Sequence, residues 1–268
     1  MRNGRKLIKY GAIAFAFVLI FGIFSSIIYG INIFFSIFND GSDDIDEMVS
    51  IDIDDTIGAL DIDVDMVDLM IKSGDDFRIE VSNVNKISYS DSYNKLVIRE
   101  KGINLFDNET KLFIYVPEDK VFDNVSIDTT VGSVNILKFN TKEIDLDLGM
   151  GSVVIDYLNV IRESSISAGV GELVIKDGIM SDLELDMGVG DGLITASVLG
   201  ESDINCGVGK LELNLNGNED DYKIEVDKGI GEIKVDGIKF SRNFYGNGNN
   251  YIDIDGGIGE VLVNFLVS

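Results

Sequence analysis

Residues 144–156 read IDLDLGMGSVVID, in which two segments of alternating apolar and polar residues meet at a Gly-x-Gly. The pattern returns five more times, as SISAGVGELVIKD (165–177), LELDMGVGDGLIT (183–195), DINCGVGKLELNL (203–215), IEVDKGIGEIKVD (224–236) and IDIDGGIGEVLVN (252–264). A fixed period of about 20 residues is the signature of a protein built from stacked repeats. This stretch therefore decides the fold class, and its glycines either bind a ligand or turn the chain.

The units are aligned on their second glycine, which we number as position zero. These glycines are Gly58, Gly132, Gly151, Gly171, Gly190, Gly209, Gly231 and Gly259. From Gly132 onward the intervals are 19, 20, 19, 19, 22 and 28 residues. Positions −5, +2 and +4 are apolar except at Gly192, and positions −4 and −6 are polar. This period of two on both sides of the glycines predicts half-buried strands.

Each unit is therefore predicted to be a strand, a sharp corner and a second strand. Stacked about 4.8 Å apart, such units bury their apolar faces together, which predicts an all-β fold, a β-solenoid with rungs of about 20 residues. Glycine suits a corner that repeats in register because it tolerates backbone angles that side chains forbid. We expect the apolar residue between the glycines, such as Met150 or Val170, to point into the core. A nucleotide-binding fingerprint would need a third glycine and a following helix, so we interpret the glycines as corners.

The N-terminal segment predicts a membrane anchor. All four basic residues of the first 38 positions lie within residues 1–9, and an uncharged apolar run fills residues 10–38. This run exceeds the roughly 20 residues that cross a bilayer. The basic tail favours a cytoplasmic N-terminus and thus a single-pass protein of the cell membrane with an extracellular C-terminal domain. A cleaved signal peptide is the alternative, but its apolar core is usually only about 7–15 residues long.

Residues 39–49 form an acidic linker, and residues 50–268 form the predicted extracytoplasmic β-repeat domain. Within it, 132–268 are the regular repeats and 59–131 are less regular, with short strands that we expect to cap the stack. We interpret SIDIDDTIGALDIDVDM (50–66) as a first rung with its corner at Gly58 and with Asp52 and Asp54 facing outward.

The charge distribution disfavours several partners. The chain carries a formal net charge of −25, and its first 38 residues hold four of the 22 basic residues and none of the 47 acids. The rest of the chain contains 18 basic residues and 47 acids, which gives a net charge of −29 after the anchor. A surface this acidic repels phosphate backbones and anionic lipids, so we expect no nucleic-acid partner.

Outward aspartates are the most prominent candidate site. Position −4 carries Asp54, Asp128, Asp147, Ser167, Asp186, Asn205, Asp227 and Asp255 in chain order. Stacked acids repel one another, and calcium, which takes six to eight oxygen ligands, would relieve the repulsion. The simpler interpretation is a solvated face that blocks edge pairing, and we favour it while a calcium-dependent adhesin stays open.

The sequence gives little support for a catalytic site. Histidine is absent, which excludes histidine triads and histidine metal sites, and Cys206 at position −3 is expected to face the core. Paired carboxylates can cleave glycosides, but 47 acids make any such pair unspecific. The loop aromatics and their basic neighbour either bind a sugar or partner or cover the end of the stack: Phe240, Arg242, Phe244, Tyr245 and Tyr251. We assign no catalytic, cofactor-binding or metal-ligating residue and no cofactor.

Two segments carry a family resemblance. LFIYVPEDKVFDNVSIDTTVGSVNI (112–136), followed by the Gly-x-Gly repeats, and the closing FYGNGNNYIDIDGGIGEVLVNF (244–265) resemble the "putative adhesin", toast-rack β-repeat family of bacterial envelope proteins. The resemblance covers about residues 50–268. It implies an N-terminal membrane segment, no demonstrated enzyme activity and, for some members, a link to envelope-stress regulators. It offers no functional residues to transfer.

We therefore expect a non-enzymatic scaffold or interaction protein, inserted in the membrane through residues 10–38 and acting in envelope stress or adhesion. Its partner would be an envelope protein or a cell-wall polymer, and the sequence leaves its oligomeric state open. A β-helix carbohydrate-active enzyme that uses outward acids is the alternative.

Overall fold

The computed structural model describes residues 48–82, 84–85, 87–100, 110–227, 229–239 and 244–266. The chain divides into two compact units, Met1–Asp44 and Ile45–Ser268. The predicted tail, anchor and most of the linker lie outside the described residues, as do Phe240 and Arg242. Within the described ranges, no helix has the length and hydrophobicity that a membrane crossing requires.

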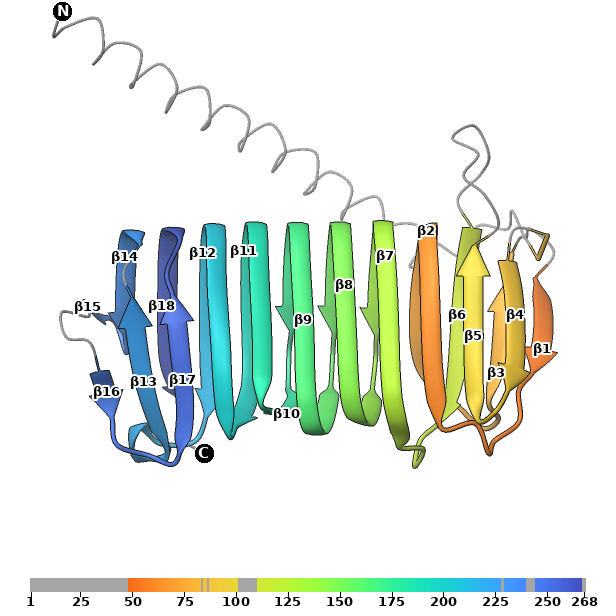
Figure 1. Cartoon of the computed structure of the whole chain (residues 1–268), viewed down its shortest axis with the longest axis horizontal. Coiled ribbons are helices and arrows are strands. Elements are labelled where there is room, and N and C mark those ends of the chain that lie inside the picture. The colour runs from red at the N-terminus through yellow and green to blue at the C-terminus, as the bar shows by residue number, and fades with distance from the viewer. Residues whose placement is uncertain are drawn as a thin grey trace, which may run out of the picture. The chain divides into compact units, whose positions relative to one another are not determined.

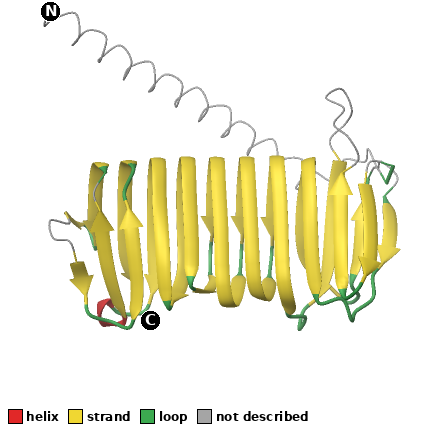
Figure 2. Cartoon of the chain, viewed as in Figure 1, coloured by secondary structure: helices red, strands yellow, loops and turns green. Residues whose placement is uncertain are grey.

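The described part of the second unit is almost entirely β-structure, with one short 3-10 helix, Glu219–Asp221 (Figure 2). Its strands, in chain order, are β1 Val49–Asp52, β2 Ala59–Gly74, β3 Arg78–Val81, β4 Ile87–Ser92, β5 Lys95–Glu100, β6 Thr110–Pro117, β7 Phe122–Ile136, β8 Phe139–Ile155, β9 Leu158–Ile175, β10 Gly178–Ser181, β11 Leu183–Leu199, β12 Glu201–Asn216, β13 Tyr222–Asp227, β14 Ile230–Val235, β15 Ile238–Lys239, β16 Phe244–Gly246, β17 Asn250–Asp255 and β18 Ile258–Leu266. The all-β prediction is confirmed.

Long strands that bend at the glycine corners form the centre of the stack (Figure 1). β2, β7, β8, β9, β11 and β12 lie side by side in this order, each parallel to the next. The ladders join equivalent glycines, for example Gly151 with Gly171 and Gly171 with Gly190. A short third side comes from β10, which pairs in parallel with the start of β9 and the end of β11. Each long strand thus supplies both arms of one rung.

The core lies between the two arms of every rung. The side chains predicted to face inward at position −5 are buried: Ile127, Leu146, Ile166, Leu185, Ile204, Val226 and Ile254. The apolar side chains at +2 and all those at +4 are buried as well, and they join one continuous hydrophobic cluster. This described core runs from Ile53 to Val263, inside the second unit, so we expect residues 45–268 to fold without the first unit.

The first rung differs from its prediction. β1 pairs antiparallel with β3, and Gly58 lies between the turn at residues 55–56 and the start of β2, where its amide donates to the side chain and the carbonyl of Asn94. The corner lies instead at Met66, which pairs with Val131, and this rung has no glycine there. The register also places Asp63, and not Asp54, beside Asp128. Gly58 was wrongly predicted to be the first corner because a glycine beside a turn and a glycine at a corner look the same in the sequence.

Antiparallel strands cap the N-terminal end of the stack, as the irregular segment predicted. β5 and β6 both run parallel to β2 and occupy the places of the two arms of a rung. Beyond them, β4 pairs antiparallel with β5, and β3 pairs antiparallel with β6. The cap therefore begins only after one further parallel layer.

The C-terminal end does not follow chain order. β17 and β18 lie between β12 on one side and β13 and β14 on the other, with every pair parallel. The last rung of the chain is therefore the penultimate layer of the stack. Short antiparallel strands, β16 on β13 and β15 on β14, cover the outermost layer. Such short strands protect an open edge from pairing with another chain.

Candidate interaction surface

The corner glycines are required by the close approach of neighbouring rungs. A Cβ added to Gly171, whose φ is +150°, would lie 1.7 Å from the carbonyl oxygen of Gly151. Gly190 meets the carbonyl oxygen of Gly171 at 1.8 Å in the same way. The first glycine of each pair is equally restricted, since a Cβ on Gly169 would lie 2.3 Å from the carbonyl oxygen of Gly149. These glycines are therefore required by the packing of one rung on the next, which supports the corner interpretation.

The apolar residue between the glycines points outward, contrary to our prediction. Met150 is 55% exposed and Ile230 is 76% exposed. The glycines on either side face along the stack, toward the next rung, so the residue between them occupies the outside of the bend. The inward phase of the alternation changes at this turn. Leu148 at position −3 and Val153 at position +2 are both buried although they are an odd number of residues apart.

These outward residues form a continuous apolar column. In stacking order it consists of Met66, Val131, Met150, Val170, Val189, Val208, Ile258 and Ile230. We call it the corner ridge. Its inner members Val170, Val189 and Val208 are half-buried, while Ile258 is 53% exposed. An apolar column of this length on a soluble surface is typical of an interaction site.

Acidic columns line the first-arm face beside the ridge. The register pairs Asp128 with Asp147, and Asp255 with both Asn205 and Asp227. Burial, and then the charges of Asp147 and Asp63, raise the pKa of Asp128 above its ordinary value. Burial, and then Glu225 and Asp203, raise the pKa of Asp253 in the same way. The predicted column of like charges therefore exists, and its charges repel one another.

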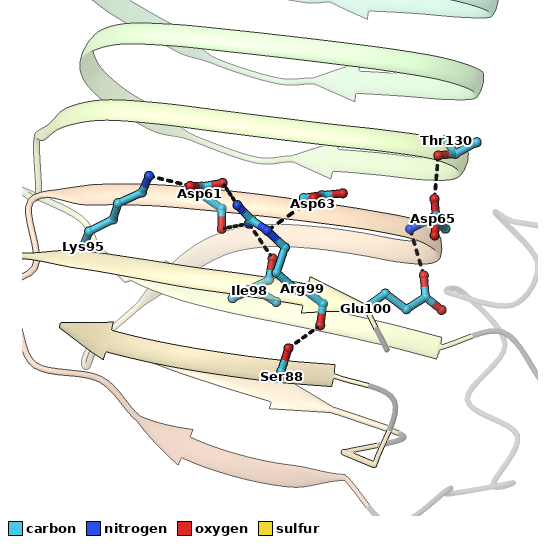
Figure 3. A network of polar contacts seen from close by, with 9 residues as sticks. All are labelled: Asp61, Asp63, Asp65, Ser88, Lys95, Ile98, Arg99, Glu100 and Thr130. Atoms are coloured by element: carbon cyan, nitrogen blue, oxygen red, sulfur yellow. Dashed lines mark hydrogen bonds and ion pairs between the residues drawn. The ribbon is translucent and has the colours of Figure 1, made fainter. Parts of the chain in front are cut away.

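At the N-terminal end, basic residues of β5 neutralise the acidic face (Figure 3). Arg99 Nη2 lies 2.7 Å from Asp61 Oδ1, and its Nε lies 3.2 Å from Asp63 Oδ2. Lys95 forms a second ion pair with Asp61. Burial alone would raise the pKa of Asp61, but the hydrogen bonds from Lys95 and Arg99 outweigh burial and lower it.

The first corner, which has no glycine, is closed by a side chain of β5, the strand that lies beside β2. Glu100 Oε2 accepts a hydrogen bond from the amide of Asp65 at 2.8 Å (Figure 3). It accepts a second one from the amide of Met66, also at 2.8 Å. On the other side, Thr130 Oγ1 donates to Asp65 Oδ1 at 2.8 Å. At this corner a carboxylate thus contacts the corner amides. At the other corners the backbone of the neighbouring rung takes that place.

Among the described residues, the acidic face presents repeated acids and no cage of metal ligands. Across the described ranges, no group of three or more Cys, Asp or Glu side chains is placed to hold a metal ion. An open hollow of about 340 Å³ is lined by Glu143, Arg162, Glu163, Asp182, Leu183, Glu184, Glu201 and Asp203. Its acids belong to the repeated columns, since Glu143 pairs with Glu163 and Glu184 pairs with Asp203. The hollow is therefore part of the repeat.

Among the other sequence candidates, Cys206, Tyr245 and Tyr251 make structural contacts, whereas Phe244 is 48% exposed. Cys206 packs against the core, and burial, with a smaller effect of Asp255, raises the pKa of its thiol to about 11. Tyr245 stacks on Phe265 with ring centroids 5.7 Å apart, so it covers the end of the stack. Tyr251 donates to Glu225 Oε2 at 2.6 Å on the acidic face, which raises the pKa of its phenol to about 12.

Comparisons with known proteins give a family and several distant structures. Residues 57–241, well over half of the chain, match the model of the family described as "Toastrack DUF4097". No curated protein matches the sequence. A crystal structure described as a "putative cell adhesion protein" from Clostridium sporogenes aligns with 14% identity over 82% of this chain and 99% of its own, at a TM-score of 0.35. A "putative adhesin" from Bacteroides fragilis aligns with 15% identity over 81% and 95%, at a TM-score of 0.36. A further "putative adhesin", from Parabacteroides distasonis, aligns with 12% identity over 82% and 96%, at a TM-score of 0.33.

Proposed function

The chain belongs to the Toastrack DUF4097 family, and on this basis we propose that it is a non-enzymatic scaffold that presents its β-repeat unit as an interaction surface in the cell envelope. The anchor in this proposal is residues 10–38, which places the repeats outside the membrane. The partner is an envelope protein or cell-wall polymer, in adhesion or envelope stress.

One observation carries the proposal: the described polar surface repeats from rung to rung. An enzyme needs unlike groups that converge in a pocket, with pKa values tuned apart. Here the acids with raised pKa values, Asp128, Glu172 and Asp253, belong to columns rich in acids. A repeated surface instead suits multipoint contact with an extended partner.

Two measurements test the proposal. In intact cells, Met150→Cys in a Cys206→Ser background should react with a membrane-impermeant maleimide, and protection until lysis would overturn the extracytoplasmic placement. Purified residues 45–268 should release no reducing ends from cell-wall polysaccharides. Turnover that disappears on a single Asp→Asn substitution would overturn the non-enzymatic assignment.

The calcium-dependent alternative has its own test. Millimolar calcium should raise the melting temperature no more than sodium chloride of matched ionic strength, which screens the same repulsion. A much larger rise with calcium would support a cation-dependent adhesin in place of a metal-independent scaffold.

A further inference from the structure

We propose that the corner ridge is the docking site for an amphipathic α-helix of a partner protein, one with an apolar stripe flanked by basic residues. This inference names the partner chemistry of the interaction surface and so depends on the proposed function. It rests on the shape, spacing and charge surroundings of the ridge.

The ridge projects from a bare backbone. In β8 the side chain of Met150 stands between Gly149 and Gly151, and in β9 that of Val170 stands between Gly169 and Gly171. Because glycines line both sides, a shallow strip without side chains accompanies the ridge along the central rungs. A partner backbone can therefore approach closely, and its side chains can straddle the ridge.

The spacing of the ridge fits a helix better than a strand. Neighbouring rungs repeat about every 4.8 Å, whereas a helix presents one side chain per turn of about 5.4 Å on a given face. Alternate residues of an extended strand are about 6.7 Å apart. The helical mismatch is about 0.6 Å per rung, so three or four turns stay in register. The eight ridge positions span about 34 Å, so a helix of about 22 residues covers the ridge, with three or four of its turns in register at any one alignment.

Acids flank the ridge on both sides. Position −4 carries, in stacking order, Asp63, Asp128, Asp147, Ser167, Asp186, Asn205, Asp255 and Asp227. Position +1 carries Asp68, Ser133, Ser152, Glu172, Asp191, Lys210, Glu260 and Glu232. Lys234 already pairs with Glu232 and Glu260, so lysine and arginine beside the apolar stripe of a helix would pair with the other acids of both columns.

The same charges argue against other occupants. A second copy of the chain would bring acidic columns against acidic columns, and an anionic membrane would be repelled. The pKa of Glu172 is raised, first by burial and then by the charge of Asp191, so these two acids of the flank repel each other. A basic partner relieves this repulsion on binding.

The test uses residues 45–268 and a fluorescein-labelled 22-residue Leu/Lys peptide with leucines at heptad a and d positions. The ridge variant is Met150→Ser/Val170→Ser/Val189→Ser, which leaves the charge unchanged. The matched control, Leu137→Ser/Ile161→Ser/Leu199→Ser, removes apolar side chains that are exposed elsewhere. Fluorescence anisotropy gives the Kd, and circular dichroism reports the helicity of the bound peptide and the folding of each variant.

We expect the ridge variant to weaken binding at least tenfold and the control variant to leave the Kd unchanged. A scrambled peptide of the same composition should bind at least tenfold more weakly than the patterned peptide. Equal Kd values for the two variants, or for the two peptides, would overturn the proposal, because charge attraction alone would then explain the binding. A wild-type dimer in sedimentation that the ridge variant abolishes would assign the ridge to a second copy, and ridge-dependent binding to phosphatidylcholine vesicles would assign it to lipid.

A second measurement does not depend on the folding of the triple variant. The patterned peptide with a photoreactive group at one leucine position should cross-link the wild type at the ridge or its flanking glycines. Cross-links confined to the acidic face would contradict the proposal. If binding fails while the maleimide and polysaccharide results above hold, this inference alone is wrong and the proposed function stands.

Discussion

Replacing one corner glycine should destabilise the unit more than its backbone angle alone explains. In Gly171→Ala the new Cβ would lie 1.7 Å from the carbonyl oxygen of Gly151, and that oxygen belongs to the backbone of the adjacent rung. Ordinary contact begins near 3.5 Å, so the rungs must separate by about 1.8 Å at the corner. This shift breaks about two ladder hydrogen bonds, each contributing about 1 kcal/mol, and holding alanine at a φ of +150° adds about 1–3 kcal/mol.

The expected loss is therefore about 3–5 kcal/mol, a large part of the roughly 5–15 kcal/mol by which domains are stable. Gly237→Ala is the matched control, because Gly237 has a φ of +71° but no heavy atom within 4 Å of an added Cβ. It should cost only the backbone strain of about 1 kcal/mol.

Urea denaturation of residues 45–268, followed by far-UV circular dichroism, measures both variants. Because repeat proteins can unfold rung by rung, hydrogen exchange of the β8 and β9 amides serves as a local readout. If Gly171→Ala were no more destabilising than Gly237→Ala and left β8 and β9 protected, close rung contact could not be the reason for these glycines.

Three further outcomes follow from the charged and buried groups. At pH 8 the thiol of Cys206 should react with Ellman's reagent about 100-fold more slowly than in the urea-unfolded chain, because burial raises its pKa from 9.0 to about 11; rates within tenfold of each other would contradict its burial. The folded-state pKa values of Asp128 and Asp253 exceed the ordinary 3.8, so the folded state binds more protons and the free energy of unfolding should rise as the pH falls from 7 toward this range. Below it, stability should fall again as Asp61 and Asp123, whose pKa values are lowered, become protonated. The initial rise should shrink in Asp128→Asn/Asp253→Asn, and an unchanged pH profile of the unfolding free energy would refute the repulsion. Finally, Arg99→Gln should lower stability by about 1 kcal/mol, a figure already reduced for solvent screening, and raise the pKa of Asp61. Arg162→Gln, at a 58% exposed side chain that pairs with Glu143, should change stability by less than about 0.5 kcal/mol, and equal effects of the two substitutions in urea denaturation would contradict the Arg99 clamp.

The inward columns of the fold were predictable from the sequence because burial imposes strict alternation. Ile127, Leu146 and Ile166 recur at one position of successive units, and all three are buried as expected. The glycine corners from Gly132 onward were predictable for a steric reason, since a Cβ at these glycines would overlap the backbone of the neighbouring rung. These features follow from local sterics and from the period, which one sequence displays.

The direction of the residue between the glycines was not predicted correctly because apolar character was taken as a sign of burial. The odd spacing between Leu148 and Val153 was the available signal, since the inward phase can change only where the chain turns. The same phase change between Val64 and Leu69 marks the true first corner at Met66. Read this way, the sequence would have placed both the ridge and the first rung.

The order of the last rungs could not be predicted from periodicity. Repeats with the same inward pattern fit any neighbouring layer, so the pattern does not distinguish β13 and β14 from β17 and β18. The 28-residue interval before Gly259 showed only that the connection is longer. The structure shows that this connection adds β15 and β16 and returns the chain into the stack.

The central claim, a parallel stack whose corners expose one apolar column, is tested most directly by paired cysteines on the ridge. In a Cys206→Ser background, Val208→Cys with Ile258→Cys joins adjacent layers, about 4.8 Å apart and within the 4.4–6.8 Å that a disulfide spans. Val208→Cys with Ile230→Cys joins layers twice as far apart, beyond that range. We expect mild oxidation to form a disulfide in the first pair and none in the second. A bridge in the second pair and none in the first would contradict the order of the stack and the outward column together.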